Sequence, residues 1–593
     1  MSAEEELTGC ERRLLEAAGV LIDVREGDPR RDDPAHAGGW GAERTVRAKF
    51  LRDLLTNPAR GIRALRLRGA RITGTLDLEG DDLVSGVLLQ DCGLDEPVNL
   101  RQARAPMIRL PGCHLPSLEA VQLDVRGNLI LDRLTATSVD LRGAQIAGVL
   151  SLDGAILTNP NGATLEGAAL TVGQGMSCRH GFTSKGQIGL YGARISQGLS
   201  FTGARLENAA GWALDAQGMH VGDYLFLGSS ISSPEGFNAD GGLRLIGVRV
   251  DGFVCCWGAH IKPHKELGTA IAGWGLTVTG NLMMNEGFAA EGVVHLINAQ
   301  VGEEINLEGA VLSNPQGHAL YAKRLAVGDS VLCTKGFTVR GAVSLADSKI
   351  GGSLDFTGAL LGEPAGNTLD LRGVTARTLV TRPATPPDQI DLRHASVIVL
   401  DDEPATWPAR LLLRGFTYEN MEHNRSVSVS TRLDWLEKDA EGYIPQPYEQ
   451  LVSAYRRAGQ EEAARKVALA KRRRQRQVLN PPGKIWNWLL YLTIGYGYRT
   501  WLAGLWLLGL MLAGAAVFAH AYPADMIATS RHPMPFNAPI YTLDVLLPII
   551  NLGQQDSWQP TGIALWVYWA LIILGWALTS ALVAGLTGIV KQN

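Results

Sequence analysis

Four residues near the middle of the chain have types and spacing that could hold a metal ion. Cys255 and Cys256 are adjacent, and His260 and His264 follow within the next eight positions. Thiolates and imidazoles are the ligands that zinc prefers. In the repeat described below, however, Cys255 aligns with polar, outward positions and Cys256 with apolar, inward ones. Adjacent strand residues point to opposite faces, so we expect no shared ion and no metal site here.

The rest of the sequence offers no motif for catalysis. It contains no phosphate-binding loop, dinucleotide-binding fingerprint, nucleophile elbow or zinc-protease motif. The acidic residues of the repeat fall at outward positions, and the cysteines are scattered as buried, reduced thiols would be. We therefore expect no catalytic residue and no cofactor. A non-enzymatic role is favoured, while an enzymatic one stays open.

A run of basic residues stands directly before a long apolar segment. The run comprises Lys471, Arg472, Arg473, Arg474 and Arg476, with Arg499 closer to the apolar segment. Nucleic-acid binding is one interpretation of such a run. Its position beside a segment without charged residues, about 501–522, favours contact with anionic lipids of the inner leaflet instead. We expect no nucleic acid as a partner.

A second apolar segment, about 563–590, predicts a second membrane span. Because the basic residues precede the first span, the positive-inside rule places the repeat region and the C-terminus in the cytoplasm of a plasma-membrane protein. The N-terminus is acidic and lacks the apolar core of a signal peptide. The sequence thus predicts a multi-pass protein of the inner membrane.

The stretch between the spans is short, apolar and acidic at one position. Segment 540–552 contains Asp544 and ends in Asn551, and Gln554 follows closely. It is too short to cross a bilayer. It either lies flat on the outer surface as an amphipathic segment or re-enters the membrane as a pore helix. In the second case Asp544, Asn551 and Gln554 would be pore residues.

The element that positions these features is a long repeat. The units end at Ile146, Ile195, Val250, Val301 and Ile350, and a Gly-Phe pair recurs at Phe182, Phe237, Phe288 and Phe337 with the same step of about 50 residues. A finer rhythm of about 11 residues separates short alternating runs. Such short strands between glycine-containing corners predict a β-helix with about 22 residues per coil, and Phe201 and Phe356 facing inward.

The expected fold is therefore mainly β. It is a β-helix solenoid with helical caps, followed by a short helical hairpin and a C-terminal two-helix transmembrane domain. The expected boundaries are 1–60 for the N-terminal helical cap, 61–400 for the repeat rod, 401–445 for a closing coil and helix, 446–484 for the helical hairpin with its polybasic segment, and 485–593 for the transmembrane domain.

The whole chain resembles a group of actinobacterial membrane proteins with pentapeptide-like β-helix repeats and a C-terminal two-helix membrane segment. The resemblance lies in the Gly-Ala-Arg-Ile coils, in Pro447-Tyr-Glu-Gln-Leu, in Gly495-Tyr-Gly-Tyr-Arg and in Leu546-Leu-Pro. The repeats here depart from a strict five-residue pattern. Members of the group often carry the name membrane-associated oxidoreductase, which implies redox chemistry.

Three functions remain open from the sequence. The first is a non-enzymatic, membrane-tethered scaffold or sensor whose rod binds a protein partner. The second is an ion channel with span, re-entrant loop and span, gated by the rod, which implies a homo-oligomer. The third, a membrane-associated oxidoreductase, rests on the resemblance alone. Regular repeats without a convergent polar cluster favour the first.

Overall fold

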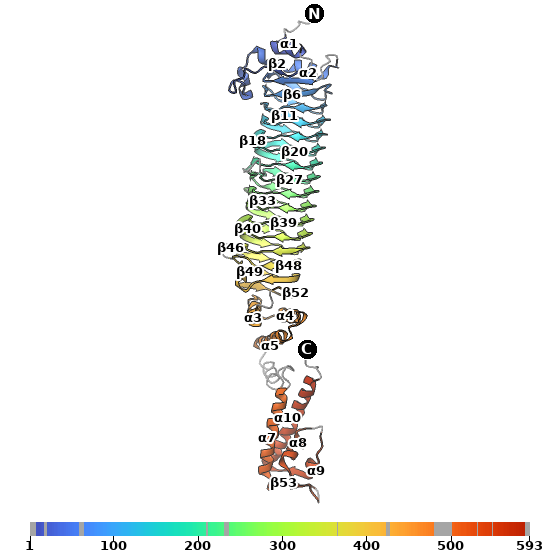
Figure 1. Ribbon diagram of the computed structural model, residues 1–593, viewed down its shortest axis with the longest axis vertical. Helices are drawn as coiled ribbons and strands as arrows, with labels where there is room; N and C mark the ends of the chain where they lie inside the picture. Colours follow the sequence, from blue (N-terminus) through green and yellow to red (C-terminus); the bar gives the residue numbers. More distant parts are fainter. Residues whose placement is uncertain are drawn as a thin grey trace. The chain divides into compact units, whose positions relative to one another are not determined.

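The computed structural model describes residues 7–16, 20–58, 64–208, 211–229, 236–363, 366–422, 427–478, 501–529, 532–547 and 550–586. The chain divides into two compact units, Met1–Gly459 and Gln460–Asn593. The first unit is a parallel β-solenoid of about 16 turns, and the second contains the helices that are apolar enough to span a membrane (Figure 1). The predicted fold class is therefore confirmed.

Most coils of the solenoid consist of four short strands, two in each of two parallel sheets, A and B. One coil is formed by β34 (Thr277–Val278), β35 (Leu282–Met283), β36 (Ala289–Glu291) and β37 (Val293–His295). Each strand pairs in register with its counterpart in the next coil, as Leu282 of β35 does with Ile305 of β39 (Ile305–Asn306). The alternating strand pattern stacks apolar side chains inside from coil to coil.

The period of about 50 residues corresponds to two coils, and core packing explains it. At one inner corner, successive coils carry alternately a phenylalanine and an alanine, joined by backbone hydrogen bonds. This column contains Phe182, Ala204, Phe237, Ala259, Phe288, Ala310, Phe337 and Ala359. All of them are buried. A large ring over a small methyl group fills the space between coils without a void or a clash.

Both ends of the solenoid are covered. At the N-terminal end, β1 (Ile22–Asp23) pairs with β3 (Ala64–Arg68), β2 (Thr45–Arg47) pairs with β4 (Arg71–Thr73), and α2 (Ala48–Thr56) packs beside β5 (Leu76–Asp77). The short helix α1 (Gly9–Glu16) lies against β2. These elements occupy the backbone edge that would otherwise invite pairing with another chain.

The C-terminal end is closed by α3 (Val429–Glu437) and α4 (Pro445–Arg457) around a buried ion pair. Arg432 of α3 donates two hydrogen bonds of 2.6 Å to Asp402, and both side chains are almost fully buried. The guanidinium also lies over the rings of Trp407 and Trp435. Helix α4 packs against β52 (Thr417–Met421), the last strand of sheet A. The last strands, β51 (Arg410–Leu412) and β52, lie within the segment 401–445 that the sequence predicts as a closing coil and helix.

The second unit contains α5 (Glu461–Val478), α7 (Trp501–Ala521), α8 (Ala538–Leu546), α9 (Gln554–Ser557) and α10 (Gly562–Leu586). Between α7 and α10, β53 (Met526–Ala528) and β54 (Trp558–Pro560) pair as a two-stranded antiparallel sheet. Two of the helices are long and apolar enough to cross a membrane: their apolar windows, Gly504–Ala521 and Gly562–Ser580, have a mean hydropathy of 1.8.

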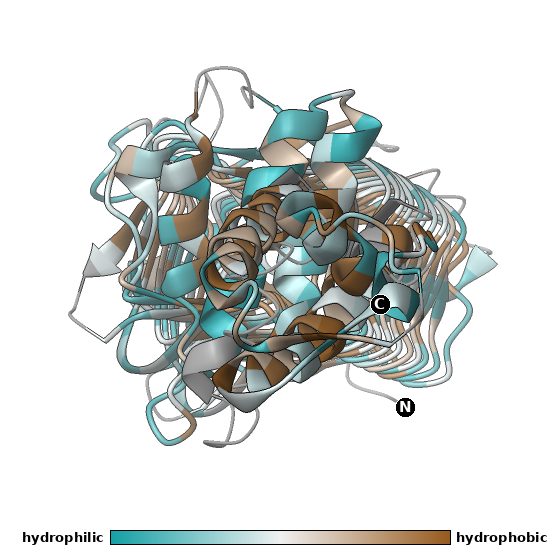
Figure 2. Ribbon diagram, turned by 90° about the horizontal axis from the view of Figure 1, so that it is seen from below, coloured by the Kyte–Doolittle hydropathy of each residue, from teal (hydrophilic) through white to brown (hydrophobic). Residues whose placement is uncertain are grey.

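Exposure separates these helices from the core helix of a soluble protein. Only 11% and 22% of the residues in the two windows are buried. Large apolar side chains such as Leu512, Trp566, Ile573 and Trp576 are more than half exposed. In the hydropathy colouring, hydrophobic residues dominate these helical ribbons, whereas the coil edges are mixed (Figure 2). Lipid is the solvent in which such surfaces are stable.

Candidate functional site

The two cysteines and two histidines do not converge on one site: Cys255 and Cys256 lie on opposite faces of sheet A, and His260 and His264 follow further along the chain. Cys255 of β31 (Val254–Cys255) pairs in register with Phe226 and Met283 of neighbouring coils, on the outer side of sheet A. Cys256 stacks inside the solenoid, where its backbone N–H donates to the carbonyl of Met283. Both side chains are buried, although the alignment with polar positions predicts an outward Cys255. Its apolar neighbours in register account for that burial.

The described thiols act as core side chains. Burial raises the pKa of Cys255 to about 11 and that of Cys10 to about 12. Burial also raises the pKa of Cys178, Cys256 and Cys333 well above the ordinary value of a thiol. Because the thiolate is the nucleophile and the metal ligand, thiols held protonated in this way contribute packing rather than reactivity.

An open groove follows the outer face of sheet A over the C-terminal half of the solenoid. Its first section, about 610 Å³, lies over β34, β38 (Gln300–Val301), β41 (Ala326–Val327) and β44 (Lys349–Ile350). A second section, about 530 Å³, continues over β48 (Thr375–Thr381), β50 (Ser396–Asp402) and β52. The two sections share Ile350, Gly351 and Thr375, so they form one continuous depression.

The first section of the groove is hollow because its floor is formed by the backbone of glycines. A Cβ atom on Gly302, Gly328 or Gly351 would lie 1.9, 1.9 and 2.1 Å from the carbonyl oxygen of the preceding coil. No side chain fits at such a distance, so glycine is the only residue that allows the coils to stack here. The same requirement leaves peptide groups accessible at the bottom of the groove.

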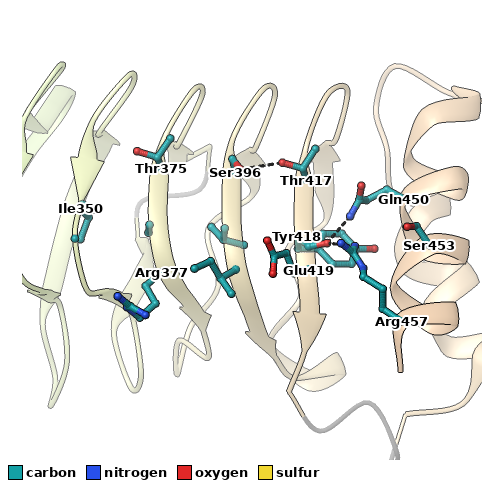
Figure 3. A pocket seen from close by; sticks show the side chains of 14 residues that line it. Ile350, Thr375, Arg377, Ser396, Thr417, Tyr418, Glu419, Gln450, Ser453 and Arg457 are labelled. Carbon is teal, nitrogen blue, oxygen red and sulfur yellow. Dashed lines mark hydrogen bonds between the residues drawn. The ribbon is translucent and has the colours of Figure 1, made fainter. Parts of the chain in front are cut away.

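One wall of the second section is a row of hydroxyl groups. Thr375 pairs with Ser396, and Ser396 pairs with Thr417, in three successive coils. The Thr417 hydroxyl donates to Ser396 Oγ over 3.0 Å, and all three side chains are exposed (Figure 3). Hydroxyl groups both donate and accept hydrogen bonds, so this row can pair with the backbone of a bound chain.

Beside that row runs a second one that contains charges. Arg377, Ile398 and Glu419 occupy neighbouring outward positions of β48, β50 and β52, and Ile398 is 40% exposed. Figure 3 labels the two charged side chains, Arg377 and Glu419. Helix α4 closes the end of the groove with Gln450, Ser453 and Arg457. Gln450 Nε2 and Arg457 Nη2 both donate to the carbonyl oxygen of Tyr418 in the edge strand.

The cations of the groove differ from the arginines of the solenoid corners. The corner arginines are neutralised by the aspartate two residues earlier, as in Arg142 with Asp140, Arg372 with Asp370 and Arg393 with Asp391. Within the described residues, Lys349 and Arg377 have no ion pair, and Arg457 contacts a carbonyl rather than a carboxylate. With Glu419 as the one acid among the lining residues, the groove carries a net positive charge.

In the helical unit, α8 packs against both long helices at the level of two glycines. A Cβ atom on Gly514 of α7 would lie 2.6 Å from Thr542 Cγ2, and one on Gly575 of α10 would lie 2.1 Å from the Leu546 carbonyl. Gly575 is 13 residues after Gly562, the start of α10, which corresponds to about 20 Å along the helix. The C-terminal end of α8 therefore lies deep between helices of membrane-spanning length.

Asp544 holds the chain that returns from this depth. Its carboxylate accepts hydrogen bonds from the N–H groups of Leu552 (2.6 Å) and Gln555 (2.9 Å), and its side chain is 4% exposed. Gln554 Nε2 donates to the Pro535 carbonyl, and Asn551 Oδ1 accepts from the Gly553 N–H. Asp544 thus bridges α8 and the return segment, whereas Asn551 and Gln554 make separate hydrogen bonds within the loop.

The predicted membrane-surface residues lie on and after α5. Lys471, Arg472, Arg473 and Arg474 are in the last turns of α5, and Arg473 is exposed. Partial burial, together with Arg472, lowers the pKa of Lys471. The side chain of Arg476, and Arg499 as a whole, lie outside the described residues. Contact of this basic run with anionic lipids stays a prediction.

No protein-family model matches the chain, and no curated protein or solved structure is detectably similar to it. The solenoid and the two apolar helices agree with the resemblance drawn from the sequence at the level of architecture. The groove residues Arg377 and Arg457 were not singled out there. The equal spacing of Thr375, Ser396 and Thr417, 21 residues apart, was the signal that could have pointed to this face.

Proposed function

We propose that this chain is an integral membrane protein that presents its β-solenoid, on the cytoplasmic side, as a binding surface for a protein partner. The observation that carries the proposal is the long, open, positively charged groove on the outer face of sheet A. It is supported by the covered ends of the solenoid, which leave the sides rather than the ends for recognition. Two exposed apolar helices supply the membrane anchor.

Site-specific photo-crosslinking in native membranes tests this function. A photoreactive amino acid at Ser396 or Thr417, both exposed in the groove, should give a discrete protein adduct. The same probe at Arg340, exposed on the outer side of sheet B, serves as the matched control and should give no such adduct. If no solenoid position gave a protein adduct, the scaffold function would be contradicted.

The buried position of α8 favours one second candidate, a channel. A short helix that enters between two spans and returns is the arrangement of a re-entrant pore element. In that case the protein should form a symmetric oligomer in detergent and conduct ions in liposomes, and Asp544→Asn should reduce the cation flux. A monomer that conducts no ions would remove this candidate and leave the scaffold.

A further inference from the structure

The groove is open and long enough for an extended polymer. Six strand steps separate Thr277 from Thr417 along the pairing column. At about 4.8 Å for each step, the column measures about 29 Å. An extended polypeptide covers this length with about eight or nine residues. The depression crosses the strands, so a bound chain would run from coil to coil along the solenoid.

The lining groups match a polypeptide backbone with acidic side chains. The hydroxyl row supplies donors and acceptors for a backbone. Arg377 and Arg457 present guanidinium groups, whose forked N–H donors fit carboxylates. Ile398, between Arg377 and Glu419 in the charged row, offers a contact for an apolar side chain.

Nucleic acid fits the same groove less well. A single strand is usually held by bases stacked on aromatic side chains as well as by contacts to phosphates. The aromatic residue among those that line the groove is Tyr418, and its side chain is 3% exposed. Glu419 also places a negative charge where a phosphate backbone would pass.

We propose that the sheet-A groove binds an extended segment of a partner protein that carries acidic side chains, with Arg377 and Arg457 as the carboxylate-binding residues. This inference rests on the proposed scaffold function and names the chemical class of its partner. Recognition combines backbone hydrogen bonds to the hydroxyl row with ion pairs at the two arginines, which sets both the direction and the register of the bound segment.

Binding of defined peptides to the full-length protein in neutral-lipid nanodiscs tests the proposal. The probe is a fluorescent ten-residue peptide of alternating glutamate and valine, and binding is followed by fluorescence anisotropy. The double variant Arg377→Glu/Arg457→Glu should weaken binding about tenfold or more, since each exposed ion pair contributes up to a few-fold and reversal adds repulsion. Binding should also weaken as salt is raised.

A double variant with the same change in net charge separates the groove from general electrostatics. Arg194→Glu/Arg340→Glu reverses two exposed arginines outside the groove and should leave peptide affinity within twofold of wild type. The double variant Arg194→Glu/Arg340→Glu should keep the thermal midpoint of the wild type, because both side chains are exposed. The groove variant should lower it only slightly, through loss of the hydrogen bond from Arg457 to the Tyr418 carbonyl. Equal weakening by the two double variants would overturn the groove as the site.

Three further outcomes would also overturn the proposal. One is equal binding of a peptide with lysine in place of glutamate. The second is that a single-stranded oligonucleotide binds in a way that depends on Arg377 and Arg457, whereas binding of the acidic peptide does not depend on them. The third is the same result with phosphatidylserine vesicles in place of the oligonucleotide. If photo-crosslinking still captured a protein elsewhere on the solenoid, the scaffold function would survive without this groove. If no position gave an adduct, the scaffold function itself would fail.

Discussion

At the scale of residues, the solenoid is specified by core side chains whose sizes match between neighbouring coils and by a few charged side chains that are buried as ion pairs. The alternation of phenylalanine and alanine at one corner makes two coils the true repeating unit. Glycine at the groove floor is required by carbonyl groups less than about 2.2 Å from any added Cβ atom. At the C-terminal end, the charge of Arg432 is tolerated in the interior because Asp402 satisfies it.

Truncation of a corner phenylalanine should destabilise the solenoid strongly. Phe288 is fully buried between Ala259 and Ala310, so Phe288→Ala should cost about 3–5 kcal/mol through lost burial and an unfilled cavity. The control is Tyr191→Ala, because Tyr191 is 58% exposed, and its cost should stay near 0.5 kcal/mol. Urea unfolding followed by circular dichroism measures both, and equal midpoints would refute the stacked column.

The ion pair at the C-terminal cap should be strongly coupled. Asp402→Asn alone leaves the buried charge of Arg432 uncompensated, and Arg432→Met alone does the same to Asp402. Each single change should lower the free energy of unfolding by about 3–5 kcal/mol. The double variant Asp402→Asn/Arg432→Met should cost clearly less than the sum of the single changes. Strict additivity in a double-mutant cycle of unfolding free energies would show that the two side chains do not depend on each other.

At the scale of elements, sequence periodicity predicted the coils, because strand alternation and glycine corners leave a regular trace. Phe201 and Phe356 are buried as their spacing predicted, and the two apolar helices begin within one residue of their predicted starts. The groove was not predicted. The groove depends on which outward residues become neighbours in successive coils. Because the coils differ in length, this cannot be read from a fixed period: one coil takes 21 residues, from Leu129 to Leu150, and another takes 28, from Val254 to Leu282.

The position of α8 was likewise undecided by the sequence, since a short apolar segment fits both a flat and a re-entrant placement. The structure places Leu546 against Gly575, deep along α10. The position of α8 along the two long helices is set by packing against Gly514 and Gly575, which are far away in the sequence. The local pattern of apolar residues does not encode such contacts. The role of Asp544 as a clamp follows from the same fold-back, because its hydrogen-bond partners lie eight and eleven residues later.

Replacement of the contact glycine should dislodge α8. Gly575→Ala places a methyl group against the Leu546 carbonyl, whereas Gly509→Ala on α7 meets nothing within 4 Å. In a Thr542→Cys background, a membrane-impermeant maleimide should not label the fully buried position. Labelling should rise with Gly575→Ala and stay low with Gly509→Ala. Equal labelling of both variants would show that α8 does not depend on this contact.

At the scale of the whole molecule, the proposed function depends on the side of the membrane that the solenoid occupies. The chain carries its basic run before the first apolar helix, at the end of α5. Between the two apolar helices, Arg531 is the only Lys or Arg in the sequence. On this basis we propose, from the positive-inside rule, that the solenoid and the basic run lie in the cytoplasm.

Reversal of the basic run should disturb this orientation. Replacing Arg472, Arg473, Arg474 and Arg476 with Glu removes the positive bias, and a mixed or inverted population is expected. Replacing the same residues with Lys keeps the charge and should keep the topology. The measurement is the fraction of protein whose loop between α7 and α10 is labelled from outside sealed cells. An unchanged fraction in the Glu variant would refute the charge argument.

Labelling of two single cysteines in sealed cells tests the central claim, a membrane-anchored chain with a cytoplasmic solenoid. Ser453 is exposed on α4, and Gln559 is exposed in strand β54, so each can be replaced by a single accessible cysteine. The seven native cysteines are buried and should give little background. A membrane-impermeant maleimide should label Gln559→Cys in sealed cells and Ser453→Cys only after permeabilisation. Labelling of Ser453→Cys in sealed cells would contradict the account.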